Sequence, residues 1–174
     1  MPAPEADRQR FRAVMGHFAT GVAVVTARDA RGAVGMTTNA LTSLSLDPLL
    51  LLVCFDNAAR TLGVVRDTGR FGVNVLRLGQ ERLAGRFASK LPLEEKFGDV
   101  AHRDEHGVPV LDGALAWVAC DLRELLPGGD HTIGIGEVAA LGHDDGRPLV
   151  WYHGAYTTVT DRWTESPPGS PGPR

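Results

Sequence analysis

The sequence predicts a mostly antiparallel β-barrel with helical insertions. At 174 residues, the chain is long enough for one domain with an apolar core and too short for two comfortable ones. Short runs of β-branched and aromatic residues recur along it, separated by Gly, Pro and Asp clusters that are typical of turns. Most of these runs follow one another without a long helix between them. This pattern argues against a doubly wound parallel sheet.

The first predicted element is a helix near the start of the chain. Four apolar residues lie at i, i+3, i+4 and i+7, so they form one stripe along a helix, opposite a group of arginines. The helix is expected to end near Gly21. The residues of the stripe are Phe11, Val14, Met15 and Phe18.

The strands are predicted from short apolar or alternating runs. Residues 22–27 and 34–38 are joined by a turn at residues 29–32, so we expect them to pair. Residues 49–55 are continuously apolar, which predicts a central strand buried on both faces. The remaining strands are expected at residues 71–76, 114–126, 132–141, 149–152 and 156–159.

Two further helices and two polar segments complete the prediction. Residues 61–67 are expected to form a short helix, and residues 80–89 a second one with Leu83, Ala84 and Phe87 inward. The charged residues 90–107 are interpreted as a surface excursion. We expect one domain over residues 1–160, followed by a disordered tail rich in Pro and Gly at residues 161–174.

Composition argues against several classes of protein. Lysine and arginine number 18 against 21 for aspartate and glutamate, a net charge of −3 without a basic stripe for nucleic acid. The longest apolar run is too short to cross a membrane, and the N-terminus lacks the apolar core of a signal peptide. Cys54 and Cys120 have no disulfide-framework or zinc-site spacing, and the histidines show no metal-binding pattern. We therefore expect a soluble cytoplasmic protein without a metal.

Residues 35–48 carry the main functional signal, because small hydroxyl and amide side chains are crowded there between two apolar runs. Such residues fill a core poorly, but they let the backbone approach a ligand and offer hydrogen-bond partners. Asn, Ser, Thr and Asp-Pro are also ordinary turn residues. The segment therefore predicts either a ligand groove or a turn between strands.

Two polar sites elsewhere each have a functional and a plain interpretation. Arg60 and Thr61 lie just before a possible helix start, where they suit a phosphate group or form an N-cap with a surface arginine. His131 follows Asp130 in a Gly-rich turn, where it either exchanges a proton near neutral pH or is simply solvated. Without a nucleophile motif, any chemistry is expected to be carried by a cofactor.

Residues 134–139 formally match the G-x-G-x-x-G/A fingerprint of dinucleotide-binding folds. They lie inside a predicted returning strand and not at a strand-to-helix turn, so we reject a dinucleotide site there. Thr132, Gly134 and Gly136 share one strand face, which predicts either close approach of another surface or a bulge.

Taken together and in order, several segments resemble the flavin-reductase-like branch of the FMN-binding split barrels. That branch includes the reductase components of two-component flavin-dependent monooxygenases. The resemblance runs from about residue 11 to residue 159. The matching segments are residues 18–26, 35–40, 43–48, 71–76, 86–88 and 129–132.

The resemblance implies a homodimer of six-stranded antiparallel split barrels, with FMN or FAD near the subunit interface. It also implies an NAD(P)H:flavin oxidoreductase, in which NADH or NADPH passes a hydride to the flavin and the reduced flavin serves a partner monooxygenase. Two other functions stay open on the same barrel, as does a purely structural dimer module. One is a flavin- or haem-binding protein without nicotinamide turnover, and the other is an FMN-dependent oxidase of the pyridoxamine-phosphate type.

The resemblance also implies roles for individual residues. Those expected to line the flavin ring are Thr37, Thr38, Asn39, Ala40 and Ser43. Those expected to border the flavin, largely through backbone groups, are Cys54, Phe55 and Asp56. Those expected at its phosphate and its tail are Arg60, Thr61, Phe87 and Ala88. His131, the expected catalytic residue, is implied to flank the nicotinamide together with Tyr156.

The chain departs from the family pattern at one point. Ala59 stands where family members often carry a second hydroxyl group, beside the expected phosphate position. The phosphate contacts are therefore expected to be weaker or to shift to Asn57 and backbone amides, which leaves FMN and FAD both open.

Overall fold

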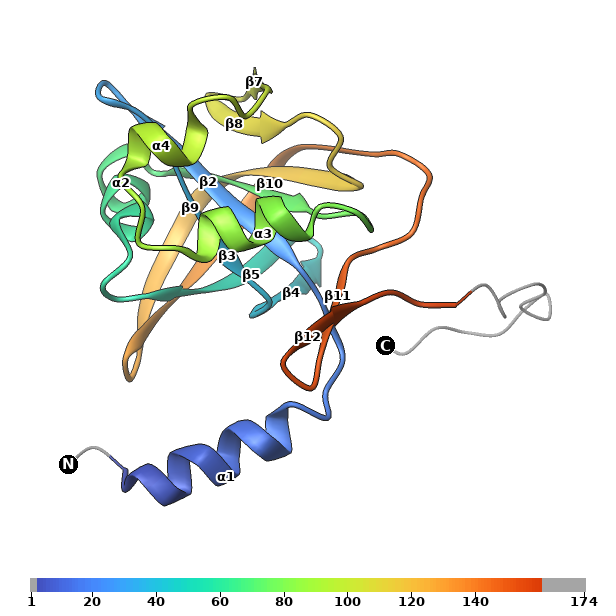
Figure 1. Cartoon of the computed structure of the whole chain (residues 1–174). Coiled ribbons are helices and arrows are strands. Elements are labelled where there is room, and N and C mark those ends of the chain that lie inside the picture. Colours follow the sequence, from blue (N-terminus) through green and yellow to red (C-terminus); the bar gives the residue numbers. More distant parts are fainter. Residues whose placement is uncertain (1–2, 161–174) are drawn as a thin grey trace.

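The computed structural model describes residues 3–160, and strands make up most of its regular structure (Figure 1). The expected C-terminal tail, residues 161–174, lies outside the described residues. Among the described residues the helices are α1 (Glu5–Met15), α2 (Arg60–Thr68), α3 (Glu81–Ala88) and α4 (Leu93–Phe97).

The strands follow one another in short steps along the chain. The first six are β1 (Thr20–Gly21), β2 (Ala23–Asp29), β3 (Gly32–Thr38), β4 (Leu41–Leu46), β5 (Leu49–Asp56) and β6 (Arg70–Val75). The others within residues 3–160 are β7 (His102–Glu105), β8 (Val108–Leu111), β9 (Ala116–Gly128), β10 (His131–His143), β11 (Val150–Tyr152) and β12 (Ala155–Thr157).

The main sheet has the strand order β3-β2-β6-β9-β10-β5-β4, and every neighbouring pair in it is antiparallel. The predicted antiparallel architecture is therefore confirmed. This sheet has seven strands where six were expected, because the polar residues of β4 pair with β5. Two small sheets lie beside it: β1-β11-β12, and the β7-β8 hairpin.

Several predicted elements are confirmed. The β2 and β3 strands pair antiparallel, with Ala23 opposite Thr38 and Asp29 opposite Gly32. The two predicted helices correspond to α2 and α3, and Ala84 and Phe87 of α3 are buried as expected. The long predicted strands near residues 114–126 and 132–141 are β9 and β10.

Three sequence predictions were wrong in part. The α1 helix ends at Met15, well before Gly21, because the chain next forms β1, which pairs with β11. The β5 strand is buried on one face only, since Leu50, Leu52 and Cys54 are partly exposed. It lies next to the end of the main sheet, with only β4 beyond it.

The third error concerns residues 90–107, which were interpreted as a surface excursion. This segment contains α4 and β7, and Lys96 and Phe97 of α4 are buried. The ring of Phe97 packs against Phe87 of α3 with their centroids 5.0 Å apart. The contact between the two aromatic rings therefore holds part of this segment against the core, although its many charged residues had predicted that it would lie on the surface.

Gly134 and Gly136, two residues apart on β10, leave space for two aromatic rings of the core. A Cβ atom on Gly134 would lie 2.6 Å from the Phe55 ring, and one on Gly136 would lie 2.5 Å from the Phe71 ring. Both rings are fully buried. The register between β9 and β10 also shifts at Ile135 and Gly136. Both predicted alternatives, close approach and a bulge, are therefore present.

The apolar stripe of α1 does not pack on the barrel. The helix leads away from the sheet in Figure 1, and none of its residues is buried. Phe11 and Val14 of α1, and Phe18 just after the helix, are each more than 60% exposed. An amphipathic helix usually buries its apolar face, so this exposed stripe is available to another molecule.

Candidate functional site

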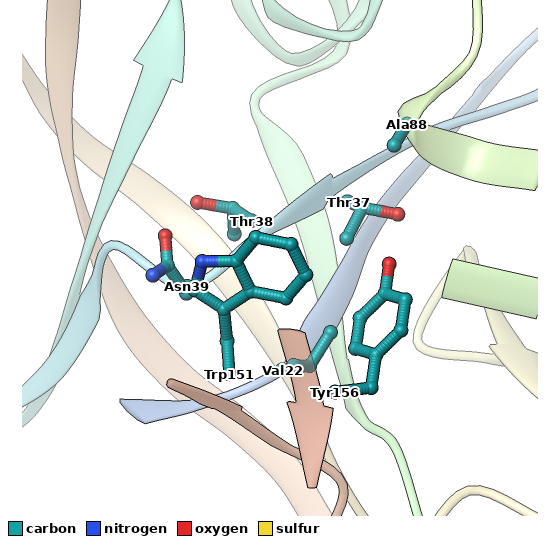
Figure 2. Close-up of a pocket in the computed structure, with 7 residues that line it drawn as sticks. All are labelled: Val22, Thr37, Thr38, Asn39, Ala88, Trp151 and Tyr156. Carbon is teal, nitrogen blue, oxygen red and sulfur yellow. The ribbon is translucent and has the colours of Figure 1, made fainter. Parts of the chain in front are cut away.

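A cavity of about 180 Å³, here called the strand-end cavity, lies where β3 ends (Figure 2). The residues that line it come from the link between β1 and β2, from β3 and the link after it, from α3 and from the β11-β12 hairpin. They are Val22, Thr37, Thr38, Asn39, Ala88, Trp151 and Tyr156. In Figure 2 the rings of Trp151 and Tyr156 face the small polar residues of β3.

Polar and aromatic groups have separate places in the strand-end cavity. The Trp151 and Tyr156 rings pack edge to face with centroids 4.9 Å apart, which makes an apolar wall. Thr38 Oγ1 accepts the Ala40 N–H at 3.0 Å, so its own hydroxyl proton is free to be donated. Together, these groups suit a planar ring with hydrogen-bonding edges.

The hydroxyl group of Thr37 is already engaged. It donates to the Ala84 carbonyl of α3 at 2.6 Å, and thereby ties α3 to β3 at the junction of two cavities. Asn39 likewise donates from Nδ2 to Thr20 Oγ1 at 3.0 Å. These two hydrogen bonds fix the positions of the polar side chains that line the strand-end cavity.

A second cavity of about 460 Å³, the helix-start cavity, lies at the beginning of α2. Thr37 and Ala88 line both cavities, so the two form one cleft beside β3. Its lining includes three cations, Arg60, Lys90 and Lys96, against one carboxylate, Asp56. This end of the cleft is therefore suited to an anion.

Arg60 is the first residue of α2, and its side chain is exposed. Ala59 occupies the N-cap and makes no side-chain cap bond, so the first turn keeps backbone N–H groups without a capping side chain. Thr61 is buried, and the Asp56 carboxylate accepts the Ala58 N–H at 2.8 Å, which shapes the turn before the helix. Cation and helix start together favour a bound phosphate.

Lys96 is a residue of this cavity that sequence reasoning missed. Its side chain is 9% exposed, and its Nζ donates to the Phe87 carbonyl at 3.1 Å. Burial lowers the pKa of the Lys96 ammonium from its usual value of 10.5. A lysine directly before a phenylalanine in a charged segment was the only available signal, and it is a weak one.

We expect Lys96→Met to reveal a pH-dependent contribution to stability. At a pH where Lys96 is protonated in both the folded and the unfolded protein, the folded wild type bears the full free-energy cost of the buried ammonium charge. Between the lowered pKa and 10.5 the unfolded chain binds more protons than the folded protein, so the free energy of unfolding rises with pH. Urea unfolding measures the free energy of unfolding of both proteins. The value for the wild type should rise relative to that of Lys96→Met as the pH approaches 10.5. A difference that is flat or falls with pH would contradict this assignment.

Many of the expected site residues meet in this cleft. Thr37, Thr38, Asn39, Ala88 and Tyr156 line the strand-end cavity. The helix-start cavity is lined by Thr37, Asp56, Arg60, Thr61, Phe87 and Ala88. Trp151, which sequence reasoning did not single out, joins the first group because β11 pairs with β1.

The other expected residues lie outside the lining of the two cavities. Ala40 and Ser43 are exposed, in the link after β3 and on β4. The Cys54 N–H donates to the Ala40 carbonyl at 2.9 Å, which holds β5 against that link. The Phe55 ring packs against Phe71 in the core, so only its backbone is able to border a ligand.

His131 begins β10, and its backbone pairs with Asp56 at the rim of the helix-start cavity. Its Nδ1 lies 2.8 Å from the Asp130 carboxylate, and this hydrogen bond lowers the pKa of Asp130. The neighbouring Thr132 hydroxyl donates to Asn57 Oδ1 at 2.7 Å, which braces the turn. The imidazole side chain is 43% exposed, so it is accessible from the solvent.

Within residues 3–160 no group of three or more His, Cys, Asp or Glu side chains is placed to hold a metal ion. Cys54 and Cys120 are free, and burial raises the pKa of the Cys120 thiol to about 12. That thiol is therefore unreactive near neutral pH. In the same described part of the chain, no helix is long and apolar enough to cross a membrane.

Comparison with known proteins gives consistent matches. A family model described as the flavin reductase like domain matches residues 15–160. The NADH-dependent flavin reductase of a Rhodococcus species is 39% identical over 159 residues, which cover 90% of this chain and 89% of the relative. The reductase subunit of a flavin-dependent monooxygenase from Rhodococcus jostii is 36% identical, with 90% and 80% covered.

Solved structures agree with the sequence matches. The NADH:FAD oxidoreductase of Streptomyces globisporus, in a complex with NAD and FAD fragments, superposes with a TM-score of 0.85 at 32% identity. The match covers 94% of this chain and 99% of that one. The resemblance therefore extends to the three-dimensional structure over nearly the whole length of both chains.

Proposed function

Because the chain belongs to the flavin reductase-like domain family, we propose that the cleft beside β3 is where it binds its flavin. The protein is an NAD(P)H-dependent flavin reductase that supplies reduced flavin to a monooxygenase partner. One observation carries the location of the site: two cavities meet at Thr37 and Ala88 and form a cleft with an aromatic end and a cationic end.

The two ends of the cleft match the two ends of a flavin nucleotide. FMN and FAD share a planar ring joined through a ribityl chain to a phosphate. The strand-end cavity offers an aromatic wall and small polar groups, and the helix-start cavity offers cations at a helix start. A buried ammonium group such as Lys96 is costly unless an anion compensates it, which further supports a phosphate there.

A bound flavin would supply the redox chemistry, as the acceptor of a hydride from NADH or NADPH, so the protein needs no covalent nucleophile. Its residues hold the two rings in contact. The free hydroxyl proton of Thr38 is available to the ring edge that gains negative charge on reduction. Trp151 and Tyr156 shield the same region from water.

Besides His131, four expected residues act from outside the two cavities in this proposal. Ala40 and Ser43 are assigned to the edge of the ring, where the link after β3 leads into β4. Cys54 and Phe55 border the flavin only through the backbone of β5, which the bond from Cys54 to Ala40 holds in position. Replacing the Phe55 side chain would therefore act on the core and not on the ligand.

For His131 we propose an orienting role toward the nicotinamide nucleotide. We expect His131→Gln to raise KM for that nucleotide by about tenfold, the value of one hydrogen bond to a charged group, with a smaller change in kcat. Steady-state kinetics with saturating flavin measure both constants. His143→Gln, at the far end of β10, is the matched control. A large fall in kcat at constant KM would instead make His131 an essential acid.

We also propose that the protein is a homodimer and that α1 contributes to its interface. The exposed apolar stripe of α1 has no partner among the described residues of its own chain. Sedimentation velocity should give a dimer, and Phe11→Ser with Val14→Ser should shift it toward a monomer. A wild-type monomer at micromolar concentration would reject the dimer without affecting the proposed activity.

The reductase activity is tested by mixing the protein with NADH or NADPH and excess FMN or FAD without air. Loss of flavin absorbance at a rate proportional to protein concentration is the expected result. Binding of flavin or haem without bleaching would favour a carrier, and turnover of pyridoxamine phosphate would favour an oxidase. If no flavin binds and none is bleached, the proposed function is wrong.

A further inference from the structure

We propose that the open groove between α3 and α4 binds the adenosine monophosphate half of FAD, so that the protein prefers FAD to FMN. This inference rests on the proposed function, because it extends the flavin site of the cleft. The groove has a volume of about 560 Å³. It is lined by Arg82, Gly85, Arg86, Ser89, Leu91, Glu95, Gly98 and Asp99.

The groove adjoins the expected phosphate position. Ser89 and Leu91 line both the groove and the helix-start cavity, so the two are neighbours across the link from α3 to α4. A ligand with a phosphate near Arg60 is thus able to continue over this link with a second phosphate. Lys90, in the same link, is exposed and lines the helix-start cavity, where it provides a cation for the diphosphate.

The groove also offers the groups that an adenosine needs. Arg82 is exposed and has no hydrogen bond or ion pair with any residue in the described range 3–160, so its planar guanidinium is free to stack on an adenine ring. Glu95 is an exposed carboxylate in the lining, and carboxylates are common acceptors for ribose hydroxyls. A purely anionic ligand would be repelled by Glu95, whereas a nucleoside uses both groups.

Gly85 lines the groove without a side chain of its own. No atom lies within 4 Å of the position that a Cβ on Gly85 would occupy, so core packing does not require a glycine there. An exposed glycine inside a helix costs about 1 kcal/mol relative to alanine. A bound adenine ring that lies against the backbone of α3 would explain this glycine, because a side chain at this position would block the ring.

The walls of the groove are held rigidly. Arg86 forms an ion pair with Asp99, and its Nε donates to the Glu95 carbonyl at 3.0 Å, which joins α3 to α4. The bond to Arg86 lowers the pKa of the Asp99 carboxyl, so this pair stays ionised near neutral pH. Because Arg86 is occupied in this way, Arg82 remains as the recognition group.

Adenosine phosphate occurs in FAD and in the nicotinamide dinucleotides, and the experiment must separate the two. We propose FAD as the source because the groove adjoins the cationic end of the cleft, where the flavin phosphate is placed. The variants are Arg82→Ala and Gly85→Leu. Arg66→Ala, an exposed arginine of α2 outside these cavities, is the control.

Isothermal titration of the full chain with FAD, FMN and AMP gives the affinities, and kinetics give KM for NADH. The wild type should bind FAD about tenfold more tightly than FMN, and AMP should compete with FAD. Arg82→Ala and Gly85→Leu should each lower FAD affinity about tenfold while FMN affinity stays within about twofold. Gly85→Leu should not lower Tm, because leucine favours a helix, so lost affinity cannot be ascribed to unfolding.

Three results would overturn the inference. One is equal affinity of the wild type for FAD and FMN, and another is a parallel loss of both affinities in the variants. The third is a higher KM for NADH with unchanged FAD affinity, which would assign the groove to the nicotinamide dinucleotide. These outcomes are distinct from failure of the proposed function, in which neither FAD nor FMN would bind and no flavin would be bleached.

Discussion

Arg60→Ala should weaken the binding of FMN by about thirtyfold, or about 2 kcal/mol, without unfolding the protein. The expected size is that of a charge-assisted hydrogen bond to a phosphate. Arg60 is exposed at the start of α2 and has no ion-pair partner within residues 3–160, so its removal leaves no buried group unsatisfied. Titration calorimetry of the variant and the wild type with FMN gives the ratio directly.

The specificity of this loss is tested with riboflavin, which lacks the phosphate. Riboflavin affinity should stay the same in Arg60→Ala, and FMN affinity should stay the same in Arg66→Ala, which removes a similar charge from the last turn of the same helix. If the wild type binds riboflavin and FMN equally well, the helix-start cavity does not hold the phosphate. Lys96 would then be a purely structural cation.

Phe87→Ala should lower the free energy of unfolding by about 3 kcal/mol or more, the usual cost of truncating a fully buried aromatic side chain. Phe87 is 1% exposed, and its ring packs edge to face on Phe97. A Cβ on Gly35 would lie 2.8 Å from the same ring, so the ring rests directly on the backbone of β3. Its loss would leave a cavity under both α3 and α4.

Urea unfolding at constant m value measures this loss. Phe87→Leu retains most of the side-chain volume and should cost less than half as much. Flavin affinity should fall together with stability in Phe87→Ala, because α3 also carries Ala88 of the cleft. An alanine variant as stable as the wild type would show that α3 is not anchored through this ring.

The strands were predictable where local chemistry was sufficient. The β2-β3 hairpin follows from two β-branched runs around an Asp and Gly turn. By contrast, the residues of β4 mix leucine with Ser and Thr, so neither a strict alternation nor an apolar run marked it as a strand. These residues form a seventh strand because they pair with β5. Backbone pairing between two strands is not visible in the residue pattern of one segment.

The candidate site was predictable to a similar degree. Thr37, Thr38 and Asn39 stood out because small polar residues are unusual between apolar strands. Trp151 and Lys96 did not, because each reaches the cleft through a long-range contact. The pairing of β1 with β11 brings Trp151 opposite Thr20, and the packing of α4 on α3 buries Lys96. The assignment of individual ligand contacts remains a prediction.

The small β1-β11-β12 sheet has a consequence for how the product leaves. It consists of strands of two or three residues, and it carries Trp151 and Tyr156 on a hairpin near the end of the described chain. Because so few backbone hydrogen bonds hold it, this sheet should open locally at a much smaller free-energy cost than the ladder between the thirteen-residue strands β9 and β10. We therefore expect the hairpin to open locally while the rest of the barrel stays folded, which would let a spent nucleotide leave.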